Sequence, residues 1–160
     1  MNIRSYVERD LPRLIELTID TFGEFYEQHF RPLVGESVFV HQHGSWREDY
    51  RAQVPELHDP PAHRYVAVAE HDSRLLGYVA WNIDPARRHG EVEILAVDRA
   101  HRHCGFGAQL CRHALCDMTE RGVEVVVIST GGDAFHAPAR RLYSALGFTE
   151  LPVAVFLKQL

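Results

Sequence analysis

The first third of the chain has the hydrophobic pattern of one short strand followed by helices. Residues 2–7 have the apolar content of a strand, and Asp10 stands where it can cap a helix. Leucine and isoleucine then recur at the spacing of a helical face until Gly23, which is expected to interrupt the helix. Further helical segments are expected at 25–30, before Pro32 and Gly35, and at 45–54.

The middle of the chain changes to the two-residue period of β-strands. Apolar runs at 65–69 and 75–83 flank a charged turn and predict a β-hairpin, and 91–97 predicts a third strand. The helical period returns at 106–118, and a buried strand is expected at 123–129. A strand, a helix and a strand in this order need parallel outer strands, for which a right-handed crossover is expected.

The last quarter predicts one more helix and two short strands. Pro138 suits the first turn of a helix, and Gly147 suits its C-terminal end. Runs at 148–151 and 153–157, separated by Pro152, are expected to finish the chain as strands. The order of elements predicts a single mixed α/β domain over residues 1–160, with a mostly antiparallel central sheet flanked by helices.

Composition and charge narrow the classes of function. Of the 160 residues, 46% are hydrophobic and 24% are charged, which is typical of a globular domain. The 17 Lys and Arg residues against 22 Asp and Glu give a formal net charge of -5, which argues against nucleic acid as a partner. The start of the chain lacks the apolar core of a signal peptide, and no stretch reaches the roughly eighteen apolar residues of a membrane helix. A cytoplasmic protein without a membrane partner is expected.

The cysteines and histidines do not form a recognisable metal or disulfide pattern. Cys104, Cys111 and Cys116 are odd in number and contain no CxxC pair, so reduced thiols are expected. Among the 11 histidines, the pairs 41/43 and 101/103 have a spacing that would place both rings on one face of a strand. No further ligand lies at a recognisable metal spacing nearby. Solvated histidines are the preferred interpretation, and no metal is expected.

A glycine-punctuated turn stands between the third strand and the helix that follows it. Residues 102–107 read RHCGFG, and the glycines allow a tight turn and a close approach of the backbone to a ligand. The first N–H groups of the helix point outward together, which favours a pyrophosphate. The segment lacks the Lys-Ser/Thr pair of a P-loop and the full glycine pattern of a dinucleotide fold. Taken alone, it fits a phosphate site or a plain tight turn equally well.

Two motifs together resemble those of the GCN5-related N-acetyltransferase (GNAT) superfamily. Arg102-x-x-Gly105-x-Gly107 matches the acetyl-CoA motif Q/R-x-x-G-x-G/A of that family. A second match, to the helix motif A-x-x-L-Y-x-x-x-G-F, is carried by Ala139, Leu142, Tyr143, Gly147 and Phe148. The matched region covers 90–148, and the preceding order of elements agrees with the family. The chain departs from the family at His136, where asparagine is common.

The resemblance implies an acetyl-CoA-dependent enzyme that transfers the acetyl group directly to a primary amine. It implies a sheet that splays after a bulge, with the Leu95 N–H near the thioester carbonyl and Val97 paired with the pantetheine arm. Arg102 adds a positive charge at the pyrophosphate, and Tyr143 holds the position of the general acid. The implied CoA-binding residues are Leu95, Ala96, Val97, Arg102, His103, Cys104, Gly105, Phe106, Gly107, Ala108, His136 and Tyr143.

The acceptor amine must lose a proton before it attacks. For an amine with a pKa near 10.4, the neutral form at pH 7 costs about 4 to 5 kcal/mol, so a base is useful. Glu91 and Glu93 are the candidates, because alternate residues of a strand share a face. The resemblance implies that Glu91 holds the carboxylate position that some members use as the base. The two carboxylates could instead bind a cationic acceptor or face solvent. A phenol such as Tyr143, with a pKa near 10, would protonate a thiolate with a pKa near 8.5.

The acceptor is expected to bind against the N-terminal helices and residues 45–61. Four aromatic residues there fit either a cleft or a core: Phe25, Tyr26, Trp46 and Tyr50. The acidic balance favours a small cationic amine, and a protein N-terminus or lysine stays open as the acceptor, as does a homodimer. Two other classes also remain, namely an acyl-CoA-binding sensor without transfer activity and a cysteine-dependent hydrolase that uses Cys104.

Overall fold

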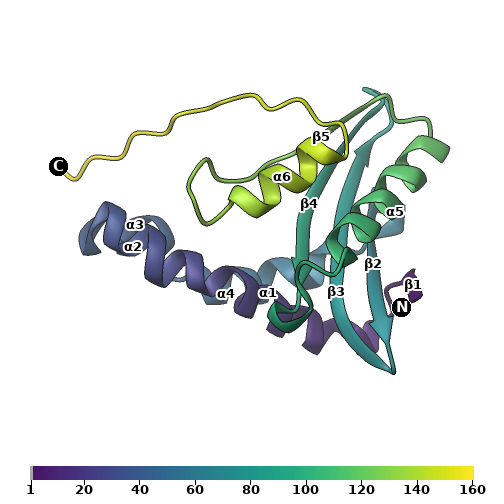
Figure 1. Ribbon diagram of the computed structural model, residues 1–160, viewed down its shortest axis with the longest axis horizontal. Coiled ribbons are helices and arrows are strands. Elements are labelled where there is room, and N and C mark those ends of the chain that lie inside the picture. The colour runs from purple at the N-terminus through teal and green to yellow at the C-terminus, as the bar shows by residue number, and fades with distance from the viewer. Residues whose placement is uncertain (1) are drawn as a thin grey trace.

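The computed structural model describes residues 2–160 and contains a five-stranded sheet in the order β1-β2-β3-β4-β5 (Figure 1). The strands are β1 (Asn2–Ser5), β2 (Arg64–His71), β3 (Arg74–Asp84), β4 (His89–Val97) and β5 (Val125–Ile128). The first four pair antiparallel and β5 runs parallel to β4, which confirms the mixed α/β architecture predicted from the sequence. The helices are α1 (Leu11–Glu24), α2 (Arg31–Val34), α3 (Glu36–His43), α4 (Trp46–Gln53), α5 (Phe106–Glu120) and α6 (Ala137–Ala145).

Side-chain alternation along β2 and β3 divides the core into two layers. Val66 and Val68 of β2 pack with Leu14 of α1 on one face, whereas Ala67 packs with Leu110 of α5 on the other. Because successive side chains of a strand point to opposite faces, a strand buried on both faces reads as a continuous apolar run. The run at 64–71 therefore supplies both layers, and the helices cover the two faces of the central strands.

The N-terminal helices form one continuous arm rather than separate pieces. The expected break at Gly23 was wrong, because α1 continues through a π-helical segment (Phe25–Phe30) into α2, and Gly35, with φ of 82°, ends the arm. A Cβ atom at residue 23 would lie 2.9 Å from Cη2 of Trp46. The glycine at this position thus permits close helix packing instead of breaking the helix. The sequence did not predict α3.

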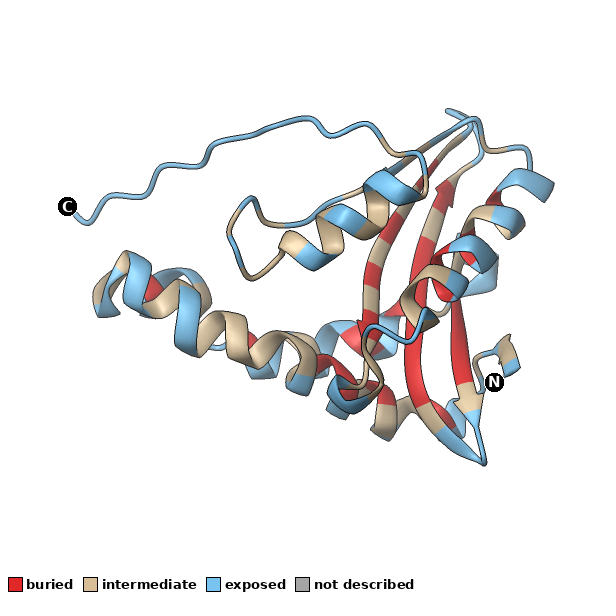
Figure 2. Ribbon diagram, viewed as in Figure 1, coloured by how far each residue is buried: buried red, intermediate tan, exposed pale blue. Residues whose placement is uncertain are grey.

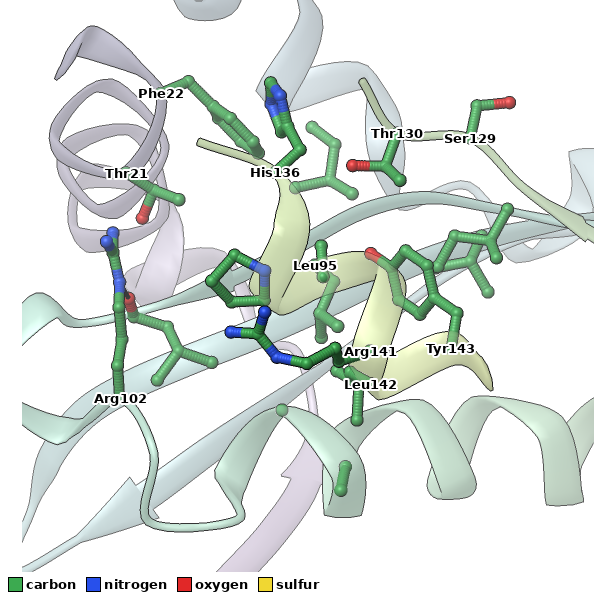
Figure 3. A pocket seen from close by; sticks show the side chains of 18 of the residues that line it. Thr21, Phe22, Leu95, Arg102, Ser129, Thr130, His136, Arg141, Leu142 and Tyr143 are labelled. Atoms are coloured by element: carbon green, nitrogen blue, oxygen red, sulfur yellow. Dashed lines mark hydrogen bonds between the residues drawn. The ribbon is translucent and has the colours of Figure 1, made fainter. Parts of the chain in front are cut away.

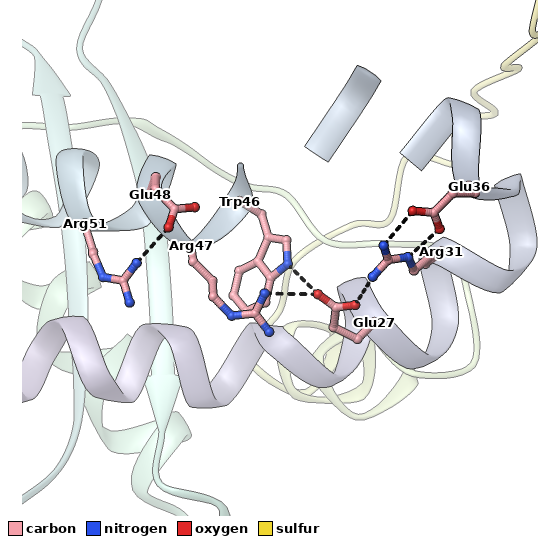
Figure 4. A network of polar contacts seen from close by, with 7 residues as sticks. All are labelled: Glu27, Arg31, Glu36, Trp46, Arg47, Glu48 and Arg51. Atoms are coloured by element: carbon pink, nitrogen blue, oxygen red, sulfur yellow. Dashed lines mark hydrogen bonds and ion pairs between the residues drawn. The ribbon is translucent and has the colours of Figure 1, made fainter. Parts of the chain in front are cut away.

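Glu27 fastens this arm to α4 (Figure 4). Its Oε1 accepts hydrogen bonds from Trp46 Nε1 at 3.0 Å and Arg47 Nη1 at 3.1 Å, and its Oε2 accepts one from Arg31 Nη1 at 2.6 Å. The Trp46 ring is buried and stacks on Tyr26 with ring centroids 5.0 Å apart. Tyr26 and Trp46 therefore pack between helices. Of the two alternatives that the sequence left open, a cleft or a core, packing within the protein holds for these two residues.

A partly buried ion pair fixes the start of α1 against β1. Arg4 donates to both carboxylate oxygens of Asp10 at 2.8 and 3.0 Å, and the Val7 N–H donates to the same carboxylate at 3.0 Å. The hydrogen bonds from Arg4 hold the pKa of Asp10 below its usual range despite burial. Asp10 thus joins β1 to α1 through its charge as well as its position before the helix.

Replacing Asp10 by alanine is expected to lower the free energy of unfolding by about 2 kcal/mol at pH 7, because the Arg4 guanidinium loses its two hydrogen bonds to this carboxylate and keeps only its pair with Glu70. A carboxyl group with a lowered folded-state pKa contributes stability above its unfolded pKa, and that contribution is lost as pH falls through the folded pKa. The difference between wild type and Asp10→Ala should therefore shrink toward pH 3 in urea unfolding. The matched control is Glu48→Ala, which removes only the exposed pair with Arg51 and should cost less than about 1 kcal/mol.

The C-terminal part differs most from the prediction. The strand expected at 123–129 is present as β5, but none of its residues is buried. The helix expected from Pro138 to Gly147 is present as α6. The strands expected at 148–151 and 153–157 were wrong, because residues 148–160 form neither strand nor helix, and residues 149–160 are exposed. Within residues 2–160, no helix combines the length and the apolar character needed to cross a bilayer.

Candidate acetyl-CoA site

The sheet opens between β4 and β5. The two strands pair only from His89 and Val125 to Val92 and Ile128, while β4 continues to Val97. A bulge lies at the same point, since Ala80 and Trp81 of β3 face Ile94 and Val92 and leave Glu93 without a partner in the register. The bulge and the splay predicted through the family resemblance are therefore both present, with Glu93 as the extra residue.

The open edge of β4 presents backbone donors to the gap. The Asp98 N–H donates to the Leu76 carbonyl on β3 at 2.7 Å. Successive N–H groups of a strand point to opposite sides, so the N–H groups of Leu95 and Val97 point away from β3 and into the gap. Arg102 reaches the same edge, where its Nε donates to the Val97 carbonyl at 3.2 Å.

A cavity of about 640 Å³ occupies this gap (Figure 3). Most of the residues that the sequence proposed for CoA binding line it: Leu95, Val97, Arg102, His103, Gly105, Gly107, Ala108, His136 and Tyr143. Ala96, Cys104 and Phe106 are not among the lining residues. Ala96 is buried on the other face of β4 with the α1 layer, and Cys104 is exposed. The geometry thus gathers the two distant motifs around one space.

The turn before α5 directs backbone N–H groups toward this cavity. His103 and Gly105 have φ of 61° and 82°, and Gly105 precedes the first helical residue. Gln109 is the first residue of the helix whose N–H bonds a carbonyl one turn earlier, that of Gly105, at 3.1 Å. The amides of residues 106–108 precede that bond and have no such carbonyl, so they offer the donors and positive potential of a helix N-terminus to an anion.

Two arginines add charge to the same cavity. Arg102 is half-buried, and the loss of solvent lowers its pKa. Within residues 2–160 neither Arg102 nor Arg141, which also lines the cavity, forms an ion pair with a carboxylate. The sequence analysis did not predict Arg141 as a site residue. Its position next to Leu142 in the matched helix motif could have indicated it. Two guanidinium groups without a carboxylate partner on one cavity favour an anionic ligand.

The Tyr143 side chain projects from α6 into the cavity, and Figure 3 shows its hydroxyl directed toward the region of Leu95. Burial, with a smaller contribution from Cys111, raises the pKa of Tyr143 to about 12. Its ring packs on Phe148, 6.1 Å between centroids, and the Phe148 N–H donates to the Tyr143 carbonyl at 3.0 Å. The phenol is therefore held in a fixed position with its proton retained at neutral pH.

The sequence made Glu91 and Glu93 equal candidates for the base, but the structure gives them different positions relative to the cavity. Glu93 lines the cavity, whereas Glu91 does not. The Glu93 side chain is 13% exposed, and its Oε1 accepts a hydrogen bond from Asn82 and lies 3.8 Å from Arg64 Nη2. The two glutamates also differ in their place on the strand, because Glu93 is the bulged residue and Glu91 pairs with Asn82 of β3. The bulge changes which side chains of β4 reach the cavity.

His136 lies at the start of α6 and is oriented by Asp133. Its Nδ1 lies 2.6 Å from Asp133 Oδ2, and its backbone N–H donates to Oδ1 of the same carboxylate at 3.2 Å. Burial alone would raise the pKa of Asp133, but the hydrogen bonds and charge of His136 lower it overall. A Cβ atom on Gly131 would collide with Asp133 Oδ2 and His136 Nδ1, so the pair needs glycine there. This leaves Nε2 of the imidazole as the nitrogen available to a ligand.

The remaining wall of the cavity comes from the N-terminal arm and α4. Thr21, Phe22, Tyr50 and Gln53 line it. Of the four aromatic residues proposed for the acceptor, Tyr50 is in this wall, and Phe25, Tyr26 and Trp46 are not. Phe25 instead packs against the His136 ring at 4.6 Å. Within residues 2–160, no cluster of three or more His, Cys, Asp or Glu side chains could hold a metal ion.

Comparison with known proteins places this site in a family. The family model described as "Acetyltransferase (GNAT) family" matches residues 12–148. This match includes the strands that splay, the glycine turn and the α6 motif. The chain therefore belongs to the GNAT family of acetyltransferases.

Curated relatives match part of their own length. The mycothiol acetyltransferase of Thermomonospora curvata is 35% identical over 115 residues, which are 71% of this chain and 37% of that protein. The mycothiol acetyltransferase of Beutenbergia cavernae is 34% identical over 108 residues, 68% of this chain and 35% of that protein. The chain thus spans little more than a third of the length of these relatives.

Solved structures share the fold at low sequence identity. A putative acetyltransferase of the GNAT family from Desulfovibrio desulfuricans has a TM-score of 0.70 at 19% identity, covering 94% of this chain and 86% of that one. AAC(6')-Iy in complex with a bisubstrate analogue, CoA-S-monomethyl-acetylneamine, has a TM-score of 0.67 at 17% identity and covers 99% of this chain and 97% of that one. At this level of identity, the likeness describes the fold alone.

Proposed function

We propose that this protein is an acetyl-CoA-dependent N-acetyltransferase that transfers the acetyl group directly to the amine of a small cationic molecule. The observation that carries the proposal is the open edge of β4, whose Leu95 and Val97 N–H groups face one cavity together with the N-terminus of α5 and the Tyr143 hydroxyl. Membership of the family supports acetyl-CoA as the acetyl donor.

The open strand and the helix N-terminus suit the two ends of acetyl-CoA. An extended pantetheine arm can pair with β4 as a strand would, with the amide of Val97 as donor. The amides of residues 106–108, with Arg102 and Arg141, suit the pyrophosphate. Leu95 N–H is then the donor to the thioester oxygen, where an oxyanion contact contributes roughly 2.7 to 4 kcal/mol to the transition state. His136, with Asp133 on its Nδ1, is assigned to the same ligand through Nε2.

Tyr143 is assigned to the leaving sulfur. With a pKa of about 12, its phenol remains protonated throughout the neutral range. Complete proton transfer to a thiolate with a pKa near 8.5 would be uphill by about 5 kcal/mol, at 1.36 kcal/mol per unit. Tyr143 therefore acts as a hydrogen-bond donor that stabilises charge as it develops on sulfur, and solvent completes the protonation. This role differs from the one expected for a phenol with an unperturbed pKa, which would transfer its proton completely to the sulfur.

The acceptor is proposed to enter from the side of Thr21, Phe22 and Tyr50. Glu93 is the carboxylate on this cavity, and it either binds the ammonium group or receives its proton. Relatives named as mycothiol acetyltransferases, and a fold neighbour bound to a bisubstrate analogue of an aminoglycoside, support a small molecule over a protein substrate. A protein N-terminus or lysine is the second candidate and is included in the test.

The test is release of free CoA thiol from acetyl-CoA in the presence of a panel of amines. The panel contains polyamines, aminoglycosides, amino-acid derivatives and peptides with free N-termini or lysine. Turnover with a small amine supports the proposal, whereas acetyl-CoA binding without transfer to any amine supports an acyl-CoA sensor. A cysteine-dependent hydrolase predicts that Cys104→Ala is inactive, and retained turnover in this variant contradicts it.

Glu93→Gln is expected to lower kcat/KM for the amine by about 100-fold, within the usual range for a positioned acid or base. The loss should be greatest at low pH, where neutral amine is scarcest. Glu91→Gln is the matched variant on the same strand and is expected to stay within about twofold of wild type, because Glu91 does not line the cavity. Steady-state kinetics from pH 6 to 9 separate the two. A loss confined to Glu91→Gln would instead assign the base to Glu91, as the family resemblance implies.

A further inference from the structure

The loop between β5 and α6 closes tightly around one imidazole. Half-buried and exposed residues alternate along it (Figure 2), and the half-buried ones are Gly131, Asp133, Phe135 and His136. Arg140 of α6 donates from Nη1 to the carbonyls of Gly131 and Asp133, which ties the loop back to the helix. Because residue 131 has no room for a Cβ atom, the backbone lies directly against the Asp133–His136 pair.

Two aromatic rings hold the imidazole in place. Phe25 of the π-helical segment and Phe135 pack on the His136 ring, with centroids 4.6 and 5.0 Å away. The His136 side chain is 15% exposed. It lines the cavity, and Figure 3 shows it on the same side as Phe22, from which the acceptor is proposed to enter. The ring therefore has a fixed orientation on the acceptor side.

Asp133 selects the tautomer of this ring. Burial alone would raise the pKa of Asp133, but His136 lowers it overall, so the carboxylate is ionised at neutral pH and can only accept hydrogen bonds. The contact of 2.6 Å between Asp133 Oδ2 and His136 Nδ1 therefore requires a proton on Nδ1. In a neutral imidazole with this tautomer, the lone pair is on Nε2.

A lone pair at Nε2 suits a proton donor. The pyrophosphate and the thioester oxygen of acetyl-CoA accept hydrogen bonds, so neither suits this nitrogen. The ammonium group of a cationic acceptor donates them and carries the proton that must be lost. An imidazole, with an ordinary pKa of about 6.5, is also a stronger base than a carboxylate, with an ordinary pKa of about 4.3. Glu93, moreover, already accepts a hydrogen bond from Asn82.

We propose that His136, oriented by Asp133, is the general base of the transfer and that Glu93 holds the ammonium group of the acceptor. Nε2 takes one proton from the ammonium group, directly or through one water, and the freed lone pair attacks the thioester carbon. As the C–N bond forms and the C–S bond breaks, the nitrogen loses a second proton to solvent, and solvent supplies one to the sulfur. The imidazolium, stabilised by Asp133, then returns its proton to solvent. The inference rests on the proposed function and refines the Nε2 contact assigned there.

His136→Gln is expected to lower kcat by about 100-fold with the best amine of the panel, while KM for acetyl-CoA stays within about threefold. His29→Gln is the matched control, because this imidazole packs on Phe135 at 4.9 Å but does not line the cavity, and its kcat should stay within about twofold. Glu93→Gln should act mainly through KM for the amine. Wild-type kcat in His136→Gln, or a rise in KM for acetyl-CoA alone, would overturn the proposal.

Acceptors of different basicity separate a base from a structural residue. An amine that is already neutral at the assay pH has no proton to lose before it attacks, so the base contributes less to its rate. The two probes are the best amine of the panel and its fluorinated analogue, in which fluorine lowers the pKa with little change in size. The loss in His136→Gln is expected to be about tenfold smaller with the analogue. An equal loss with both would overturn the assignment as base.

The tautomer is measured without turnover. Nitrogen NMR of the imidazoles is expected to show a ring protonated at Nδ1 whose signal is absent from His136→Gln. Asp133→Asn should change the tautomer of that ring and lower kcat by about tenfold or more. A wild-type ring protonated at Nε2 would overturn the base alone. Absence of turnover with every amine would contradict the proposed function, and the base with it.

A pair of glycine variants tests the position of the ring. Gly131→Ala places a Cβ atom against both Asp133 and His136, and is expected to lower kcat by about tenfold or more. Gly132→Ala is the control, because nothing lies within 4 Å of its Cβ position, and it should stay within about twofold of wild type. Equal kcat values for the two variants would contradict a catalytic position of the pair.

Discussion

Gly107→Val is expected to weaken acetyl-CoA binding by about tenfold or more, which corresponds to about 1.4 kcal/mol. A Cβ atom at this position would lie 3.4 Å from Leu142 Cδ2, 3.8 Å from Val97 Cγ2 and 3.9 Å from Leu95 Cδ2. These side chains come from α6 and β4, so both walls of the cleft lie in contact distance of a Cβ atom at residue 107. The two further methyl groups of valine have to enter the space between them, where the proposed ligand lies. Calorimetric titration with acetyl-CoA measures the effect.

Graded substitution separates blocking of the cleft from damage to the fold. Gly107→Ala adds only the Cβ atom at ordinary contact distances and is expected to bind within about threefold of wild type. Gly132→Val is the control in the loop before α6, because nothing lies within 4 Å of its Cβ position. Wild-type affinity in Gly107→Val, or an equal loss in Gly132→Val, would remove Gly107 from the proposed binding surface. Thermal unfolding of each variant checks that the helix remains intact.

The cofactor end of the cleft was predictable because its determinants are local. Residues 102–107 place Gly105, whose positive φ suits glycine, and a helix N-terminus within one turn, and these two features follow from residue type, whereas the positive φ of His103 does not. The parallel pairing of β4 with β5 also followed, since a strand, a helix and a strand in sequence require it. A sequence motif of this kind encodes its own geometry.

The acceptor end depended on contacts between distant segments. The alternation of β4 is interrupted at Glu93, and its register is set by β3 through Ala80 and Trp81, which no pattern within β4 reveals. The sequence predicted a helix break at Gly23. The contact that explains this glycine is made with the ring of Trp46, which lies on another helix. Both errors arise because a local rule was overridden by a packing partner far away in sequence.

The C-terminal error has a different cause. The apolar pattern of 153–157 is typical of a strand, but a strand must pair with the edge of a sheet, and in the structure these residues pair with none. The pattern therefore predicted the conformational preference without the partner.

Tyr143→Phe is expected to lower kcat by about 100-fold or more, with acetyl-CoA affinity unchanged within about twofold. The substitution removes only the hydroxyl and keeps the ring packed on Phe148. Because the phenol makes its contact as charge develops on sulfur, its loss affects the transition state more than the bound substrate. Tyr65→Phe is the matched control, since it removes a surface hydroxyl that accepts a hydrogen bond from Arg121 far from the cavity.

The pH profile tests the assigned role of Tyr143 further. A donor with a pKa of about 12 is lost only as pH rises through that value, so Tyr143 adds no alkaline decline to kcat between pH 7 and 10. Wild type and Tyr143→Phe are therefore expected to give parallel profiles across that range, offset by the same factor. An alkaline decline near pH 9 that disappears in Tyr143→Phe would show that the phenol titrates in the working range and acts as a full proton donor. A kcat equal to wild type would show that solvent or another side chain stabilises the charge on the leaving sulfur, and would remove Tyr143 from this role.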